Sequence, residues 1–196
     1  MRHYPVVTLF SLLIVLGAAT PLRAQEPATV DVAGGYAFSH IIDNEGTSLP
    51  AGWFASVGGY LTPHVAIVGE GTGAYKSESL TFSNAGLTFS ADVKLRLYTF
   101  QAGPRFASRS GSTTVFGQVL AGGATISASG SATGLGFNRS SDTSKTYFAF
   151  TPGGGVDVRA TEHLGVRFLA NFQLISAEDD WGKVFVAGVG LMWANK

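Results

Sequence analysis

The chain has 196 residues, of which 13% are charged and 12% aromatic, and its formal net charge is zero. Ordinary soluble domains carry about 25% charged residues, and a neutral chain gives no indication of nucleic-acid binding. The absence of cysteine excludes a disulfide framework, thiol chemistry and a cysteine-linked lipid anchor. Few charges, 26 glycines and many aromatic residues are instead typical of a membrane β-barrel, in which each strand supplies one apolar face.

The N-terminal segment predicts an export signal. Arg2 and His3 form a short polar start, residues 6–19 form a largely apolar run, and Ala24 supplies a small residue for cleavage. The run is shorter than the roughly 20 apolar residues of a membrane-spanning helix. We therefore predict a secretory signal peptide over residues 1–24 and an outer-membrane β-barrel domain over residues 25–196.

Eight segments of the remaining chain alternate between two kinds of side chain, which is the period of a β-strand. The clearest lies at residues 162–175, where Leu164, Val166 and Phe168 share one parity and Gly165, Arg167 and Asn171 the other. It is about as long as a tilted strand that crosses a bilayer, whereas soluble sandwich strands average about 5–6 residues. The predicted strands are 29–41, 52–61, 65–76, 95–107, 113–126, 145–159, 162–175 and 183–194.

The faces of the strand at 113–126 stay open. Gln118 favours an inward position for Phe116 and Leu120, but the opposite assignment also fits.

The connections between these segments alternate in length. Short turns are expected at 62–64, 108–112 and 160–161, and longer polar connections at 42–51, 77–94, 127–144 and 177–182. This layout is typical of bacterial outer-membrane barrels, whose short turns face the periplasm. We therefore predict an all-β fold, an eight-stranded antiparallel up-and-down transmembrane β-barrel in the bacterial outer membrane, exported through the periplasm.

Two of the long connections also contain apolar residues. Leu80 alternates with Phe82, and Leu87 with Phe89, which indicates a hairpin that continues beyond the membrane. Such extensions either bind surfaces by edge addition or pack on each other as a lid, and the sequence leaves both open.

The polar parity places charged residues inside the predicted barrel. Three acids and three bases balance there, and buried charges must be paired. An eight-stranded barrel is only wide enough to be filled by its own side chains, so a structural polar plug is favoured over a selective pore. We expect a cluster near the periplasmic end and Glu70 with Arg167 near the middle. The periplasmic cluster comprises Asp31, Arg105, Asp157 and Arg159.

Outside the barrel, the sequence offers one candidate ligand site and one weak catalytic candidate. Lys94 and Arg96 share the lipid-facing parity at the outer end of their strand, where cations meet either solvent or lipopolysaccharide phosphates. His40 with Ser39 or Glu45 is the only hydrolytic candidate, and adjacent residues of a strand point to opposite faces. No metal-binding spacing or phosphate-binding loop occurs, so no catalytic residue, metal ligand or cofactor is predicted.

The sequence resembles a known group, the small eight-stranded outer-membrane β-barrels related to the OmpA transmembrane domain and OmpX. The resemblance covers residues 29–193. The resemblance rests on residues 32–36, Gly52 with Trp53, residues 98–100, residues 103–106 and the last strand at 188–193. It implies that the barrel-assembly machinery recognises the last strand, although three residues follow Trp193 where many relatives end at the aromatic residue.

Four hypotheses follow for function. The leading one is an integral outer-membrane barrel with a structural or surface-interaction role and no catalysis, whose partners are outer-membrane lipid, lipopolysaccharide and a surface ligand of the long loops. The second is a narrow, porin-like conduit for small or hydrophobic solutes. The third is a lipid-modifying enzyme at the outer rim, and the fourth is a soluble periplasmic β-sandwich.

Overall fold

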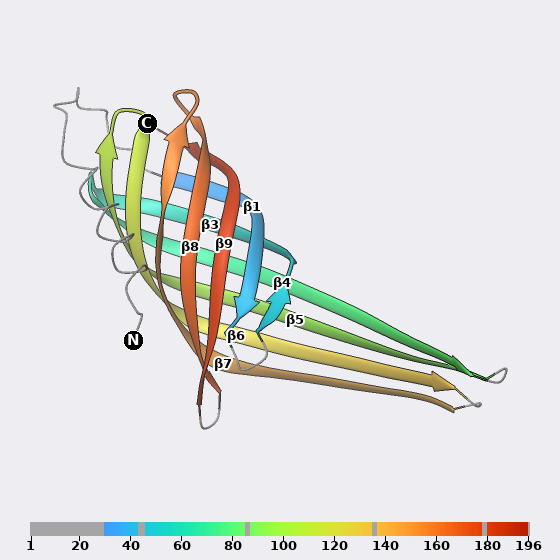
Figure 1. Cartoon of the computed structure of the whole chain (residues 1–196). Coiled ribbons are helices and arrows are strands. Elements are labelled where there is room, and N and C mark those ends of the chain that lie inside the picture. Colours follow the sequence, from blue (N-terminus) through green and yellow to red (C-terminus); the bar gives the residue numbers. More distant parts are fainter. Residues whose placement is uncertain (1–29, 43–45, 85–86, 135–136, 178–179, 196) are drawn as a thin grey trace, which may run out of the picture.

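The computed structural model describes residues 30–42, 46–84, 87–134, 137–177 and 180–195, and these residues form one antiparallel sheet that closes on itself (Figure 1). The predicted signal peptide, residues 1–24, and its cleavage site lie outside the described residues. Within the described ranges, no helix is long and apolar enough to cross a bilayer.

The strands follow one another along the chain without any intervening helix in the described part. They are β1 (Val30–Ile41), β2 (Thr47–Leu49), β3 (Ala51–Thr62), β4 (Val65–Asn84), β5 (Leu87–Ser110), β6 (Thr113–Gly134), β7 (Phe137–Arg159), β8 (Leu164–Ala177) and β9 (Asp180–Ala194).

The sheet becomes a barrel because its first and last long strands pair. β1 lies antiparallel to β9, from Asp31 opposite Ala194 to Ile41 opposite Val184. The short β2 lies beside the end of β1 and β3 lies beside its first half, so these two strands share one position in the ring. The ring therefore has eight positions, which confirms the predicted eight-stranded antiparallel barrel. Closure leaves no open sheet edge in hydrocarbon, where each unpaired backbone group costs several kcal/mol.

Glycines make the closing seam possible. Gly35 of β1 lies opposite Gly190 of β9. A Cβ atom on Gly35 would overlap the carbonyl oxygen of Val189, and one on Gly190 would overlap the carbonyl oxygen of Gly34. The two strands therefore approach more closely here than any residue with a side chain allows.

Four strands continue far beyond the ring. β4, β5, β6 and β7 have 20, 24, 22 and 23 residues, against 14 and 15 in β8 and β9. Their outer parts remain paired as a four-stranded sheet, which projects from the barrel in Figure 1. We call this sheet the arm. It comprises residues 77–84, 87–94, 127–134 and 137–144.

The arm corrects the predicted strand ends. The segments 77–94 and 127–144, expected as polar connections, are strands except at 85–86 and 135–136, which lie outside the described residues. The extension expected from the alternation at Leu80, Phe82, Leu87 and Phe89 is confirmed for the backbone. The prediction of long loops was wrong because a polar segment marks the end of the hydrocarbon layer, whereas the hydrogen-bonded ladder continues wherever a neighbouring strand is present.

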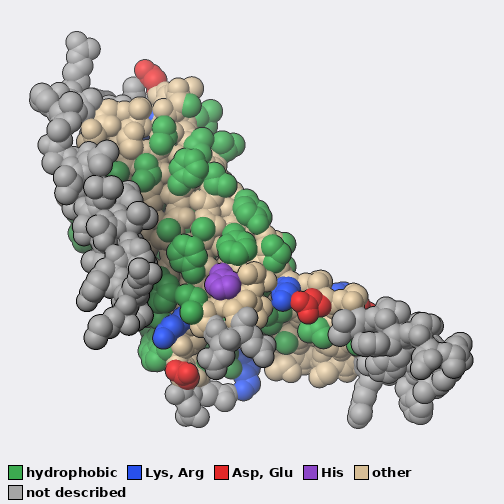
Figure 2. Space-filling view, viewed as in Figure 1, with side chains coloured by type: hydrophobic (Ala, Val, Ile, Leu, Met, Phe, Trp, Pro, Cys, Tyr) green, Lys and Arg blue, Asp and Glu red, His purple; other side chains and the backbone are tan. Residues whose placement is uncertain are grey.

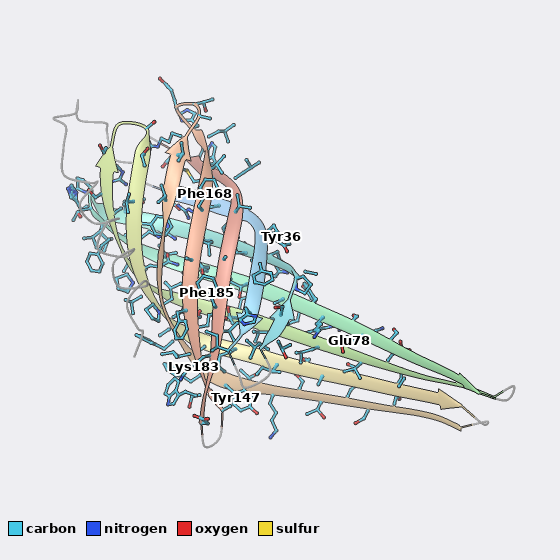
Figure 3. The ribbon with its side chains drawn as sticks, in the orientation of Figure 1. Tyr36, Glu78, Tyr147, Phe168, Lys183 and Phe185 are labelled. Atoms are coloured by element: carbon cyan, nitrogen blue, oxygen red, sulfur yellow. The ribbon has the colours of Figure 1, made fainter. Side chains whose placement is uncertain are left out.

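Side chains alternate between the inside and the outside of the barrel. In β8, Arg167 and Asn171 are buried, whereas Leu164 and Phe168 are about half exposed, at 52% and 51%. Tyr36, Phe168 and Phe185 lie on the outside in Figure 3, and hydrophobic side chains cover much of the barrel surface in Figure 2. Hydrocarbon is the natural partner of such a surface.

The same alternation settles the faces of β6. Phe116 and Leu120 are buried inside the barrel, as Gln118 indicated.

The interior has two chemically different zones. Its middle holds buried charged and amide side chains, and the end towards the arm holds a cluster of small and aliphatic residues. That apolar zone includes Ala37, Leu49, Ala74, Leu97, Ala124, Ala149, Ile175 and Val184.

Candidate functional site

Arg167 is at the centre of a buried charged network. Its Nε and Nη2 atoms donate to the two carboxylate oxygens of Asp157 at 2.7 and 2.8 Å. Nη2 also donates to Oδ1 of Asp31 at 3.1 Å, and Nη1 donates to Oγ of Ser56 at 3.0 Å. The guanidinium therefore joins β8 to β7, β1 and β3, through the fork geometry that suits carboxylates.

Arg105 extends the network towards β6. Its Nη1 atom lies 3.3 Å from Oδ1 of Asp31, and its Nε and Nη2 atoms donate to Oε1 of Gln118 at 3.0 and 2.8 Å. The ring of Phe116 lies close to both guanidinium groups, with its centroid 4.3 Å from the Arg105 carbon and 4.9 Å from that of Arg167. Asp31 and the aromatic face together offset the repulsion between the two cations.

Glu70 is held by amides and not by a direct ion pair among the described contacts. Its Oε1 atom accepts from Nδ2 of Asn171 at 2.6 Å, and its Oε2 atom accepts from Nε2 of Gln118 at 3.0 Å. Gln118 thus connects the Glu70 carboxylate to Arg105, so that the acid and the cation share one hydrogen-bonded chain.

A layer of hydroxyl and amide groups follows on the arm side of the charges. Thr72 and Thr99 lie 2.7 Å apart at their Oγ1 atoms, and Thr151 donates to Oε1 of Gln101 at 2.9 Å. Nε2 of Gln101 and Oε1 of Gln173 are buried without a protein partner. The side chains of the polar zone are therefore buried, but they do not satisfy all of its hydrogen-bonding atoms.

The structure brings five of the six predicted lumenal residues into this network: Asp31, Glu70, Arg105, Asp157 and Arg167. The sixth, Arg159, lies two residues beyond Asp157 on β7. It is half-buried, and its Nε atom has no hydrogen-bond partner.

The expected division of these residues was wrong in one respect. Arg167 lies directly across from Asp157 in the β7–β8 pairing, so it belongs with the Asp31 group instead of standing apart with Glu70. The short β7–β8 turn fixes that pairing, and counting outward from the turn would have placed these two residues opposite each other.

Two contributors to the network lie outside the six predicted lumenal residues. Ser56 is a short hydroxyl on a face of small residues, and Phe116 is an aromatic ring among polar neighbours. Closure of the barrel brings Ser56 of β3 to Arg167 of β8, whereas Phe116 lies two residues from Gln118, the partner of Arg105 in the β5–β6 hairpin.

At the outer rim, Ser39 and His40 point to opposite faces of β1, as the alternation of a strand predicts. Ser39 is buried and His40 is half-buried on the other parity of β1. Nδ1 of His40 instead lies 3.0 Å from Oγ of Ser48 on β2, a cross-strand neighbour that the sequence did not single out. Glu45 lies outside the described residues. Among the residues of the described strands and turns, no cluster of three or more potential metal ligands occurs.

Lys94 and Arg96 lie exposed on the outer face of β5, at the base of the arm. Together with Tyr75, Ser77 and Tyr98 they line a hollow of about 440 Å³. The side chains of Phe100 and Phe148 are exposed on the barrel side of this point. The two cations therefore lie where the apolar outer surface ends.

The model of the outer membrane protein β-barrel domain family matches residues 8–192 of this chain. The chain belongs to that family. It is accordingly a β-barrel of the bacterial outer membrane, which confirms the predicted location. A comparison with curated protein sequences gave no match.

Solved structures with a similar fold include three surface or outer-membrane barrels. Ail, the attachment invasion locus protein of Yersinia pestis, is 19% identical to this chain with a TM-score of 0.56. The structure of its complex with the heparin analogue sucrose octasulfate is 20% identical with a TM-score of 0.59. Neisserial surface protein A is 9% identical with a TM-score of 0.54, and the N-terminal barrel of Pseudomonas aeruginosa OprF is 12% identical with a TM-score of 0.50. Each comparison covers 87% of this chain and 100% of the other.

Proposed function

We propose that this protein is a non-catalytic outer-membrane barrel that presents the arm for interactions at the cell surface. The observation that carries this proposal is the pair of unpaired edges of the arm. Among the residues that the structure describes, β4 pairs with β5 alone beyond Tyr75, which lies opposite Ala51. Beyond Phe148, which lies opposite Ser176, β7 pairs with β6 alone.

These edges suit the addition of an extended segment from another protein. An edge strand exposes a row of backbone N–H and C=O groups that pair with any incoming strand. Backbone hydrogen bonds then supply affinity, and alternate side chains supply selectivity. Because the arm stands beyond the apolar belt, its edges are accessible from outside the cell in the orientation with short turns in the periplasm.

The comparison with Ail agrees with this proposal at the level of architecture. That protein is named for attachment and invasion, and one of its structures holds a heparin analogue. A shared barrel supports a surface role by analogy alone, so the edges of the arm remain the main argument.

The interior supports a plug in preference to a conduit. Arg105 and Arg167 are fully buried, and buried aliphatic residues such as Leu97 lie between the polar network and the arm. A permeating solute would have to displace paired charges, which costs several kcal/mol for each uncompensated ion. We therefore propose a structural role for Asp31, Glu70, Arg105, Asp157, Arg159 and Arg167.

Two further partners belong to the proposal. Lys94 and Arg96 are placed to meet lipopolysaccharide, because cations at this depth favour anionic headgroups. β9, whose final residues resemble an assembly signal, is proposed as the strand that the barrel-assembly machinery recognises during insertion.

Truncating the arm tests the surface role. Residues 80–91 and 130–141 are replaced by short turns, so that Ser79 and Asp92 remain paired, as do Ser129 and Asp142. Cells that display the wild-type barrel should adhere to immobilised host-surface proteins, and cells that display the truncated barrel should lose that adhesion. As a control, the truncated barrel should give the band of a folded barrel on an unboiled gel, which shows that it has assembled. Equal adhesion by both would refute the role of the arm.

A further inference from the structure

The outward side chains of β5 change from apolar to charged within a few residues. Phe100 is 66% exposed, and Tyr98, Arg96 and Lys94 follow it on the same face towards the arm. Aromatic side chains that share a depth with cations mark the headgroup layer of a membrane. This row therefore crosses from the acyl chains into the headgroups of the outer leaflet.

The cations have hydroxyl groups directly beside them. Arg96 lies opposite Tyr75, and Lys94 lies opposite Ser77, in the β4–β5 pairing. The rings of Tyr75 and Tyr98 meet edge to face with centroids 5.7 Å apart, and Nε1 of Trp53 donates to the Tyr75 hydroxyl at 2.9 Å. Trp53 thereby fixes the position of Tyr75, so one wall of the hollow is already ordered.

Two of the three cations that line this hollow have no ion-pair partner in the described part of the chain, and the third is Lys76. None of the ion pairs found among the described residues includes Lys94 or Arg96. The acid on the same face of β5, Asp92, accepts a hydrogen bond from Ser79 at 2.5 Å, and Glu78 pairs with Lys76 at 2.8 Å. An arginine and a lysine beside a hydroxyl group form a donor set that suits a phosphate group.

A second hollow adjoins the first and shares its Tyr75, Lys76 and Ser77. It has about 630 Å³ and lies where β3 stops pairing with β4, lined also by Ser48, Pro50 and Glu78. Its mixed lining suits a sugar, because the oxygen atoms of Ser48 and Glu78 can bind hydroxyl groups while the ring of Tyr75 can pack against the apolar face of the sugar. Both volumes fall within the roughly 300–1,000 Å³ of small-molecule sites.

We propose that the two hollows form one site for the phosphorylated sugar headgroup of an outer-leaflet glycolipid. The phosphate lies against Lys94, Arg96 and the Ser77 hydroxyl, and the sugar lies in the second hollow beside Tyr75. The acyl chains run down the barrel past Tyr98 and Phe100. This assignment rests on and deepens the lipopolysaccharide part of the proposed function. It uses only the base of the β4 edge, at Ser77 and Glu78, and not the outer part of the arm that the truncation removes.

The test uses the refolded full-length barrel in nanodiscs and measures the binding of purified lipopolysaccharide. Wild type is compared with the double variant Lys94→Gln/Arg96→Gln. Charge-assisted hydrogen bonds are strong enough that loss of both cations should weaken binding by roughly tenfold or more. Lys183→Gln is the matched control, because Lys183 is also exposed at the outer end of its strand (Figure 3) but belongs to β9, which lies across the ring from β5. Its binding should equal that of wild type.

Chemically altered ligands identify what the site recognises. Dephosphorylated lipopolysaccharide should bind wild type and the double variant alike. Equal binding of intact lipopolysaccharide to wild type and the double variant would overturn the proposal. Equally tight binding of the deacylated, phosphorylated sugar would also overturn it, since the ligand would then be a soluble anionic sugar instead of a lipid.

The arm-truncated barrel separates this inference from the surface role. It retains both hollows and should bind the glycolipid normally, while the Lys94→Gln/Arg96→Gln variant should retain adhesion. Loss of glycolipid binding on truncation alone would place the site in the removed part of the arm and overturn the assignment to the hollows.

Discussion

Replacing Arg167 with alanine tests whether the interior network stabilises the barrel. Arg167 is fully buried and makes two short hydrogen bonds to Asp157, one to Asp31 and one to Ser56. After truncation Asp157 would lose both of the hydrogen bonds that hold its carboxylate, and Asp31 would keep only the 3.3 Å contact with Arg105. The variant therefore leaves buried negative charge uncompensated.

The expected loss in the free energy of unfolding is large for a single substitution. Breaking a buried ion pair by removing one partner costs about 3–5 kcal/mol, and most single substitutions cost about 0.5–3 kcal/mol. With a urea dependence of about 2 kcal/mol per molar, a loss of about 4 kcal/mol lowers the unfolding midpoint by about 2 M. The cavity left by the guanidinium adds to the loss and does not offset it.

The measurement is urea unfolding in lipid vesicles, followed by tryptophan fluorescence and by the folded band on unboiled gels. Arg159→Ala is the comparison, because Arg159 lies on β7 with an unpartnered Nε atom and is only half-buried. It should lower the midpoint far less than Arg167→Ala. An unchanged midpoint for Arg167→Ala would show that the inward charges are hydrated and weakly coupled, and the plug hypothesis would then fail.

Three further outcomes follow from the same structure. Gly190→Val should prevent closure, because its side chain would strike the Gly34 carbonyl, and a folded, heat-modifiable band should be absent while the exposed Gly59→Val folds normally. Wild-type protein should be silent in planar bilayers at high protein load, and single-channel steps would restore the conduit hypothesis. Mass spectrometry of protein from the membrane should give Gln25 as the first residue, and an intact N-terminus would contradict the predicted cleavage after Ala24.

The barrel was predictable because lipid imposes one simple constraint on every strand. Each outward residue between the two headgroup layers must be apolar or small, so the parity of β8 identifies both faces from the sequence alone. The inward set then follows by default, and buried residues such as Arg105 and Asn171 were correctly assigned to the lumen.

Contacts inside the barrel were less predictable, because they depend on the relative positions of strands that are distant in the chain. Asp31 and Arg167 are separated by 136 residues, and their contact arises only when β1 closes against β9. Contacts between strands joined by a short turn are more predictable, since the turn determines which residues lie opposite each other. Counting from the short turns could therefore have paired Asp157 with Arg167 and placed Phe116 beside Arg105, whereas it could not have placed Ser56 beside Arg167.

The arm shows why the edge of the membrane and the end of a strand must be judged separately. Along the outer face of β5, Phe100 and Tyr98 give way to Arg96 and Lys94, while the pairing with β4 and β6 continues without interruption. On the neighbouring strand β6 the outward residues become Thr125 and Ser127 at the same level. The change from apolar to polar side chains occurs in register across adjacent strands, as a single lipid boundary requires. That boundary is where the two hollows lie, so the residues that end the membrane-facing surface are also those best placed to bind its headgroups.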